Sequence, residues 1–172
     1  MKTLLKSLFM SAILTTALAA AEFPVNGTFE KNQKGDPINW QIRNMRPTVN
    51  VEVLPASDQK GNALLIETDK SVLPVSCQIM HLKNCKKVNV SLRAKGNAGF
   101  AVQLNGFNKN CRYVTTILAL ESRASGDEFK EFKGSVQIPE NTGDKKIEYF
   151  SINLLVFSRS QIVFENVQLS GE

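Results

Sequence analysis

The chain has few of the residues on which most catalytic and metal-binding sites depend. It contains one histidine, His81, and three cysteines in 172 residues. No Ser-His-acid set can be assembled around His81, which lies in an alternating, strand-like segment. The cysteines lack the spacing of zinc sites, and the carboxylate pairs fall in expected loops or on exposed strand faces, where nothing marks one for glycoside hydrolysis. The sequence therefore predicts a protein that is not an enzyme.

Tryptophan and tyrosine are also scarce. There are one Trp and two Tyr, against ten Phe. Sugar-binding sites stack the C–H bonds of the sugar on Trp or Tyr rings, whereas Phe belongs mostly to protein cores. The aromatic content therefore limits the number of sugar-stacking positions and does not by itself favour sugar binding.

Long apolar runs are confined to the N-terminus. Residues 1–21 combine the basic Lys2 and Lys6, an apolar stretch from Leu8 to Leu18, and small residues suited to cleavage, which is the pattern of a secretory signal peptide. The apolar stretch is too short to cross a bilayer. We therefore expect residues 22–172 to form a single exported domain, secreted or periplasmic, with no membrane span.

Clustered charge of one sign is absent as well. The formal net charge is +5, but the basic residues are scattered apart from small groups such as Lys145-Lys146. A nucleic-acid-binding protein would more often align its basic residues in a stripe with aromatic residues between them. We therefore expect no nucleic-acid partner.

Short alternating segments fill the rest of the chain, with no helical period and no internal repeat. Apolar and polar residues alternate over residues 49–53, 88–95, 100–105, 114–120 and 132–138. A period of two buries one face of each strand, as in antiparallel sheets. The segment Ile147–Phe157 has apolar residues at both odd and even positions, so both of its faces should be buried, and it is expected to be a central strand. Turn residues, including Gly96-Asn97 and Ser125-Gly126-Asp127, separate the segments. The sequence predicts an all-β sandwich or barrel of nine or ten short strands.

Side-chain parity predicts a hairpin between residues 99–108 and 111–122, with residues 108–110 as its loop. In that register Leu104 would lie opposite Val114 on the core side. The opposite, exposed face is a candidate ligand surface. Its expected members are Gln103, Asn105, Tyr113 and Thr115.

The same chain path places Cys85 and Cys111 at one end of the molecule. In an oxidising compartment the sequence predicts a disulfide between them, which would contribute about 2–4 kcal/mol. Cys77 lies within an expected strand from Val75 to Leu82, where it is predicted to act as a small buried hydrophobic residue.

The two ends of the expected domain carry matching motifs. Asn26-Gly-Thr-Phe-Glu30 with Trp40 begins it, and Ile162-Val-Phe-Glu-Asn-Val-Gln-Leu169 ends it. They resemble the ends of secreted carbohydrate-binding modules with the galactose-binding-like fold, a two-sheet antiparallel jelly-roll sandwich. The segments Lys60–Leu64 and Val90–Lys95 resemble internal strands of the same family. The resemblance covers nearly all of residues 22–172.

The resemblance implies a non-catalytic domain that binds a glycan or polysaccharide weakly through a sheet face or loop edge. The candidate ligand residues are Tyr113, Gln103, Asn105, Arg43 and Trp40, although the family also uses a Trp at this position for core packing. A structural calcium ion is implied too, held by Glu30, Glu165 and nearby backbone carbonyls. The alternative is a structural or adhesive surface protein that keeps the fold without binding sugar, and the scarcity of Trp and Tyr favours it.

Overall fold

The structure is a computed structural model, and it describes residues 21–42, 49–69, 73–140, 145–157 and 160–172. The predicted signal peptide, apart from Ala21, lies outside these residues and stays a prediction. Within the described residues no helix is long and apolar enough to cross a membrane.

Ten β-strands occupy the described residues, which confirms the all-β prediction. The strands are β1 Ala21–Glu22, β2 Trp40–Ile42, β3 Val49–Pro55, β4 Asn62–Thr68, β5 Leu73–Cys77, β6 Met80–His81, β7 Lys87–Phe107, β8 Tyr113–Gln137, β9 Tyr149–Val156 and β10 Ser160–Gly171.

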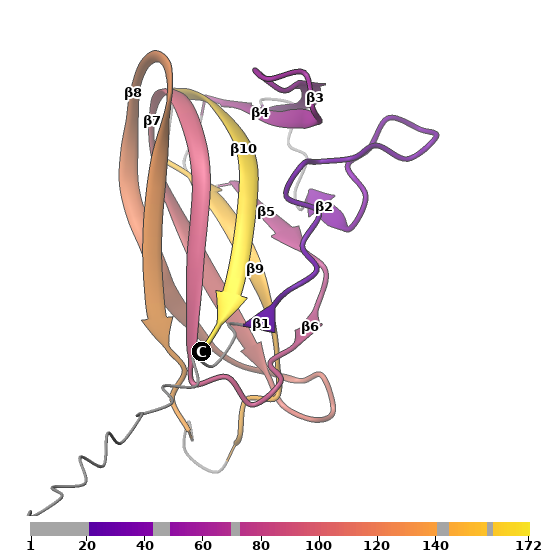
Figure 1. Cartoon of the computed structure of the whole chain (residues 1–172), viewed down its shortest axis with the longest axis vertical. Helices are drawn as coiled ribbons and strands as arrows, with labels where there is room; N and C mark the ends of the chain where they lie inside the picture. The colour runs from indigo at the N-terminus through magenta and orange to yellow at the C-terminus, as the bar shows by residue number, and fades with distance from the viewer. Residues whose placement is uncertain (1–20, 43–48, 70–72, 141–144, 158–159) are drawn as a thin grey trace, which may run out of the picture.

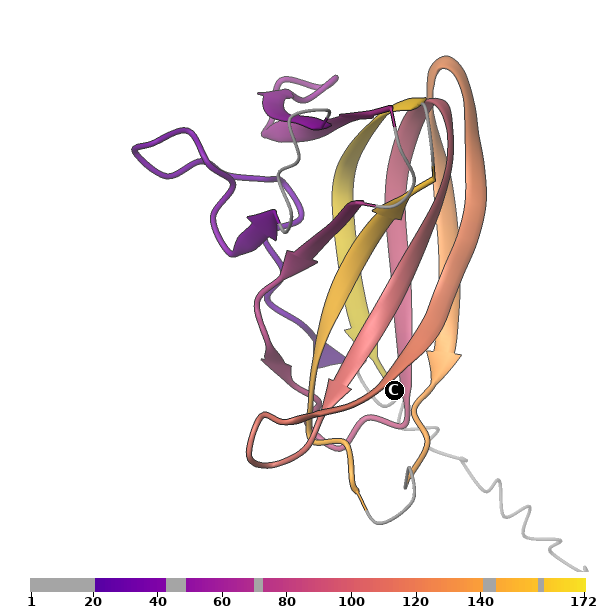
Figure 2. The same cartoon turned by 180° about the vertical axis from the view of Figure 1, so that it is seen from behind.

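All of these strands pair antiparallel, and the sheet curls so that its halves face each other as two layers (Figures 1 and 2). The front layer contains β3, β4 and β10 with the first half of β7 and the second half of β8. The back layer contains β2, β5 and β9 with the remaining halves of β7 and β8. β1 pairs with the end of β10, and β6 pairs with the start of β9. This is the predicted jelly-roll sandwich.

β7 and β8 pass from one layer to the other at a glycine corner. The sequence predicts turns at Gly96-Asn97 and at 125–127, which is wrong, because both strands continue through these positions and Gly96 pairs with Gly126. Both glycines have positive φ, 130° and 98°, a conformation that glycine adopts without steric cost. A bulge beside Gly96 adds to the bend. The two strands are therefore 21 and 25 residues long instead of short.

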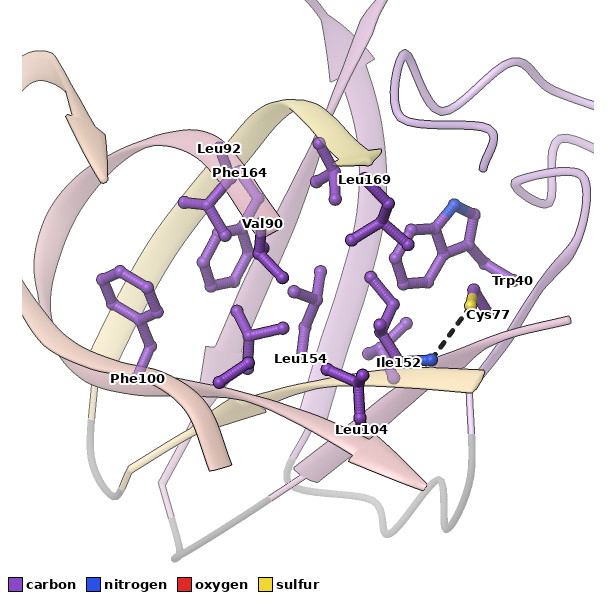
Figure 3. Close-up of a cluster of buried hydrophobic side chains, with 14 of the residues drawn as sticks. Trp40, Cys77, Val90, Leu92, Phe100, Leu104, Ile152, Leu154, Phe164 and Leu169 are labelled. Atoms are coloured by element: carbon purple, nitrogen blue, oxygen red, sulfur yellow. Dashed lines mark hydrogen bonds between the residues drawn. The ribbon is translucent and has the colours of Figure 1, made fainter. Parts of the chain in front are cut away.

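The core lies between the two layers and is rich in phenylalanine and branched aliphatic side chains (Figure 3). Phe100 is fully buried and packs edge-to-face against Phe132 and Phe164, with ring centroids 5.1 and 5.4 Å away. β9 lies between β5 and β7, and seven of its eight residues are buried. This confirms the prediction of a central strand between Ile147 and Phe157.

Trp40 belongs to this core. Its side chain is 6% exposed, its ring lies 5.3 Å from that of Phe29, and its indole N–H donates to the carbonyl of Asn26 at 2.8 Å. It cannot offer its ring face to a ligand. The ligand role proposed for Trp40 is thus corrected to core packing, which the resemblance also implied.

The three cysteines are free thiols. Cys77 is buried as predicted, its sulfur accepts the Ile152 N–H at 3.2 Å, and burial raises the pKa of its thiol to about 12 (Figure 3). The predicted Cys85–Cys111 disulfide does not form. The segments that carry the two residues do lie at the same end of the sandwich (Figure 1). However, the Cys85 side chain packs against Gly171 of β10, whereas Cys111 is exposed in the hairpin loop.

Candidate functional site

The hairpin between β7 and β8 forms as predicted, but in a different register. Leu104 pairs with Ile117 instead of Val114, and the loop spans residues 108–112. The Asn108 side chain accepts two backbone N–H groups of this loop, and Cys111 has a positive φ of 55°. A bulge between Gly106 and Phe107 completes the shift. The longer loop and the bulge together move the pairing by three residues.

Five side chains, four of them polar, form a row across the outward surface of the back layer, which we call the back face. The back layer is nearest the viewer in Figure 2. Residues paired across antiparallel strands point to the same side of a sheet, so one row crosses all five strands. Its members, in order, are Gln41, Ser76, Asn153, Gln103 and Leu118. Neighbouring members are separated by the strand spacing of about 4.8 Å.

A second polar row runs beside the first, and its members are Ser151, Asn105 and Thr116. The Thr116 hydroxyl donates to Asn105 Oδ1 at 2.6 Å and lies 2.9 Å from the hydroxyl of Tyr113. This contact chain fixes Tyr113 on the same face as Asn105. The prediction that Gln103, Asn105 and Tyr113 share one exposed face is therefore confirmed, although Thr116 takes the place expected for Thr115.

An aromatic row closes the back face at the end near the hairpin loop. Its members are His81, Tyr149, Phe107 and Tyr113, paired in that order across β6, β9, β7 and β8. The His81 and Tyr149 rings lie 5.0 Å apart, and the Phe107 and Tyr113 rings lie 6.4 Å apart, both in edge-to-face arrangements. Tyr113 is 55% exposed. Sequence reasoning missed Tyr149 and Phe107, although Phe107 has the parity of Gln103 and Asn105.

The middle of the back face contains polar groups without partners. Ser76, Ser151 and Asn153 are 4%, 4% and 6% exposed. The Ser76 hydroxyl donates to Asn153 Oδ1 at 2.5 Å, but the Asn153 Nδ2 and the Ser151 hydroxyl have no hydrogen-bond partner within the described residues. A buried polar group without a partner costs about 1–3 kcal/mol. Both groups can form one more hydrogen bond, but the polar side chains that a molecule on the face can reach are the half-buried Gln103 and Asn105, which pair with Asn153 and Ser151.

The three rows contain no Asp, Glu, Lys or Arg side chain. The Nδ1 atom of His81 accepts the backbone N–H of Lys83 at 2.8 Å. Charged residues lie at the margins of the face, with Glu121 on β8 and Arg112 in the hairpin loop. The face is thus suited to a neutral polar ligand.

A wide groove on the outward surface of the front layer differs from the back face. It has a volume of about 770 Å³ and lies between β1, β10, β7 and β8. Its polar lining residues are Glu22, Asn89, Ser91, Lys133, Ser135, Gln168, Ser170 and Glu172. All of them are exposed or half-exposed, so water can satisfy them.

The residues expected to bind calcium make other contacts. Glu165 is 1% exposed, and its oxygens accept from Ser57 and pair with Arg93, whereas the Glu30 side chain is exposed. Within the described part of the chain no three His, Cys, Asp or Glu side chains are grouped to hold a metal. These side chains do not fit a calcium site as they are arranged here. Arg43, a predicted ligand residue, lies outside the described residues.

No protein-family model matches the sequence, and no curated protein matches it. Solved structures do match. The CBM22-1 xylan-binding domain of Paenibacillus barcinonensis Xyn10C has a TM-score of 0.61 at 13% identity, over 89% of this chain and 97% of that one. The CBM22-1–GH10 modules of Clostridium thermocellum xylanase 10B, complexed with xylohexaose, give 0.63 at 12% identity, over 88% of this chain and 29% of that one.

A cyclase from Fischerella sp. TAU, in complex with 4-(1H-indol-3-yl)butan-2-one, is also similar. Its TM-score is 0.65 at 16% identity, over 89% of this chain and 98% of that one. Identities this low show the fold alone. The chain therefore has the jelly-roll fold of carbohydrate-binding modules, a fold that the cyclase shares.

Proposed function

We propose that the protein is a non-catalytic, exported carbohydrate-binding-module-like domain that binds an uncharged glycan or polysaccharide chain weakly on its back face. The observation that carries this proposal is the polar surface of the back face, where the half-buried Gln103 and Asn105 lie beside two buried groups, Asn153 Nδ2 and the Ser151 hydroxyl, that have no hydrogen-bond partner among the described residues. A sugar presents hydroxyls that both donate and accept, and so can satisfy amides and hydroxyls alike.

The aromatic row is better suited to a single polysaccharide chain than to the flat surface of a crystalline polysaccharide. Tyr113 and Tyr149 can meet sugar C–H bonds with their rings. Their aromatic neighbours, Phe107 and His81, stand at 78° and 81° to them, so the rings do not form one coplanar platform. With two tyrosines and no exposed tryptophan, little stacking area is available, and weak binding is expected.

The similar structures support this proposal only through their fold. One is a xylan-binding domain and another contains a CBM22 module complexed with xylohexaose. The similarity to the cyclase leaves an active enzyme as a competing function. We propose a binding role because the rows of the back face contain no carboxylate or thiol and one histidine, whose Nδ1 is already hydrogen-bonded.

The test is a titration of the protein with soluble neutral polysaccharides, including xylan and mixed-linkage glucan, by calorimetry and affinity electrophoresis. Tyr113→Ala and Gln103→Ala should each weaken binding about tenfold, the effect of 1–2 kcal/mol of lost contacts. Gln168→Ala, in the front-layer groove, is the matched control and should bind like the unaltered protein. If Gln168→Ala abolishes binding and Tyr113→Ala does not, the back face is not the site.

The alternative is a structural or adhesive protein without sugar binding. The observation that favours it is the burial of Trp40, which removes the only tryptophan from any ligand surface. Absence of binding to every neutral polysaccharide by protein that melts cooperatively would support this alternative and reject sugar binding.

A further inference from the structure

Glu165 lies where three segments distant in the sequence meet: β10, β7 and the turn after β3. Arg93 Nη1 is 2.6 Å from Glu165 Oε1, which also accepts the Ser57 hydroxyl at 2.9 Å. The backbone N–H of Ser57 donates to Glu165 Oε2 at 3.1 Å. A carboxylate that is 1% exposed is stable only when it is paired and hydrogen-bonded. One guanidinium and two neutral donors meet that requirement here.

The backbone carbonyls beside Glu30 also have partners. The pairs are Gly27 O with Val167 N at 3.1 Å, Thr28 O with Asn62 N at 2.9 Å, Phe29 O with Asn62 Nδ2 at 3.2 Å, and Glu30 O with Asn26 Nδ2 at 3.1 Å. Calcium requires six to eight oxygen ligands. The oxygens near the two glutamates accept instead from N–H and O–H donors, and a guanidinium at ion-pair distance repels a second cation.

Arg93 is held in place from another side. Its guanidinium lies 5.3 Å from the centroid of the Phe129 ring, an attractive cation–π distance. The Arg93 side chain is 38% exposed, so the charge that reaches the buried carboxylate belongs to a partly solvated side chain.

We infer that Arg93 supplies the positive charge at this junction, where the resemblance to carbohydrate-binding modules implies a calcium ion. Arg93 and Ser57 hold the C-terminal strand through Glu165. Asn62 holds the N-terminal segment through the carbonyls of Thr28 and Phe29. The stability of the sandwich then depends on the chain's own side chains and does not require a divalent cation.

The first test is thermal unfolding of the unaltered protein with excess calcium and with EGTA. A resident ion at a hundred times its Kd would add about 2.7 kcal/mol, which for a chain of this size raises the Tm by several degrees. We expect coincident unfolding curves. A Tm several degrees higher in calcium would overturn the inference whether or not the protein binds a glycan.

The second test is a double-mutant cycle. Arg93→Gln should lower the Tm by roughly 5 °C or more, because it leaves a buried carboxylate without its cation. Arg123→Gln is the control, since among the described residues Arg123 makes an exposed hydrogen bond to Asn97 at 3.2 Å and no ion pair. In the Arg93→Gln background, Glu165→Gln should restore part of the loss. Strictly additive losses, or equal effects of the two arginine variants, would contradict the role of Arg93. If Arg93→Gln does not fold, the calcium comparison on the unaltered protein still decides.

Discussion

Gly134 lies where the two halves of β8 approach each other at one side of the sandwich. A Cβ atom at this position would overlap the carbonyl oxygen of Ala119 and lie 2.9 Å from the Leu120 Cβ. β8 hydrogen-bonds only to β7 within the described sheet, so it is an edge strand in both layers. The contact at Gly134 brings these edges together, which limits their access to other chains.

Gly134→Ala is expected to lower the free energy of unfolding by about 1–3 kcal/mol, because the backbone must shift to admit the methyl group. Ser135→Ala is the control, since Ser135 is exposed and should change stability by less than about 0.5 kcal/mol. Urea unfolding of the three proteins measures the difference. Equal midpoints for Gly134→Ala and the unaltered protein would mean that the two halves of β8 are not packed so closely.

Residue types alone predicted part of the back face, whose role in binding stays a proposal. Gln103, Asn105 and Tyr113 have a parity that put them on one exposed face, and the structure confirms it. The resemblance favours core packing for Trp40, which the structure confirms, and only its inclusion among the ligand residues is wrong. The partners of Glu165 were missed, since Ser57 precedes it by 108 residues and no local pattern links them.

The corner of β7 and β8 is the element that sequence reasoning misread. Gly96-Asn97 and Ser125-Gly126-Asp127 have the composition of hairpin turns, and composition does not distinguish a turn from a bend in a continuous strand. Periodicity did identify the strands on either side, because burial on one face imposes it. The register was missed because the bulge and the longer loop change the pairing, and the residue types of this segment do not reveal either of them.

The two corner glycines give a prediction for this element. In Gly126→Ala the added Cβ would have no atom within 4 Å, so only the positive φ opposes the substitution. It should lower the free energy of unfolding by about 1–2 kcal/mol. Gly96→Ala has a positive φ too, and its Cβ would also overlap the Gln161 carbonyl oxygen, so it should cost clearly more. Chemical unfolding of both variants ranks them. A larger loss for Gly126→Ala would show that conformation, and not the contact with β10, limits the corner.

At the scale of the whole molecule, surface ion pairs connect the C-terminal residue and the strand ends. Lys86 pairs with Glu140 at 2.9 Å and Lys87 with Glu172 at 3.0 Å. The hydrogen bond from Lys86 lowers the pKa of Glu140, and hydrogen bonds from Asn89 and then Lys87 lower the pKa of Glu172, both from the ordinary value of 4.5. The same contact with Glu140 raises the pKa of Lys86 above 10.5.

A carboxyl whose pKa is lowered in the folded state contributes stability above its ordinary value and loses it as the pH falls through the folded value. Lys86 contributes stability below pH 10.5 and loses this contribution as the pH rises through its raised pKa.

We therefore expect the Tm to decline modestly below about pH 4.5, with a second decline above about pH 10.5. Both declines should diminish in 1 M salt, because exposed pairs are screened. Combined Glu140→Gln and Glu172→Gln substitutions should flatten the acid-side decline. An unchanged decline would show that these two carboxyls do not cause the acid sensitivity.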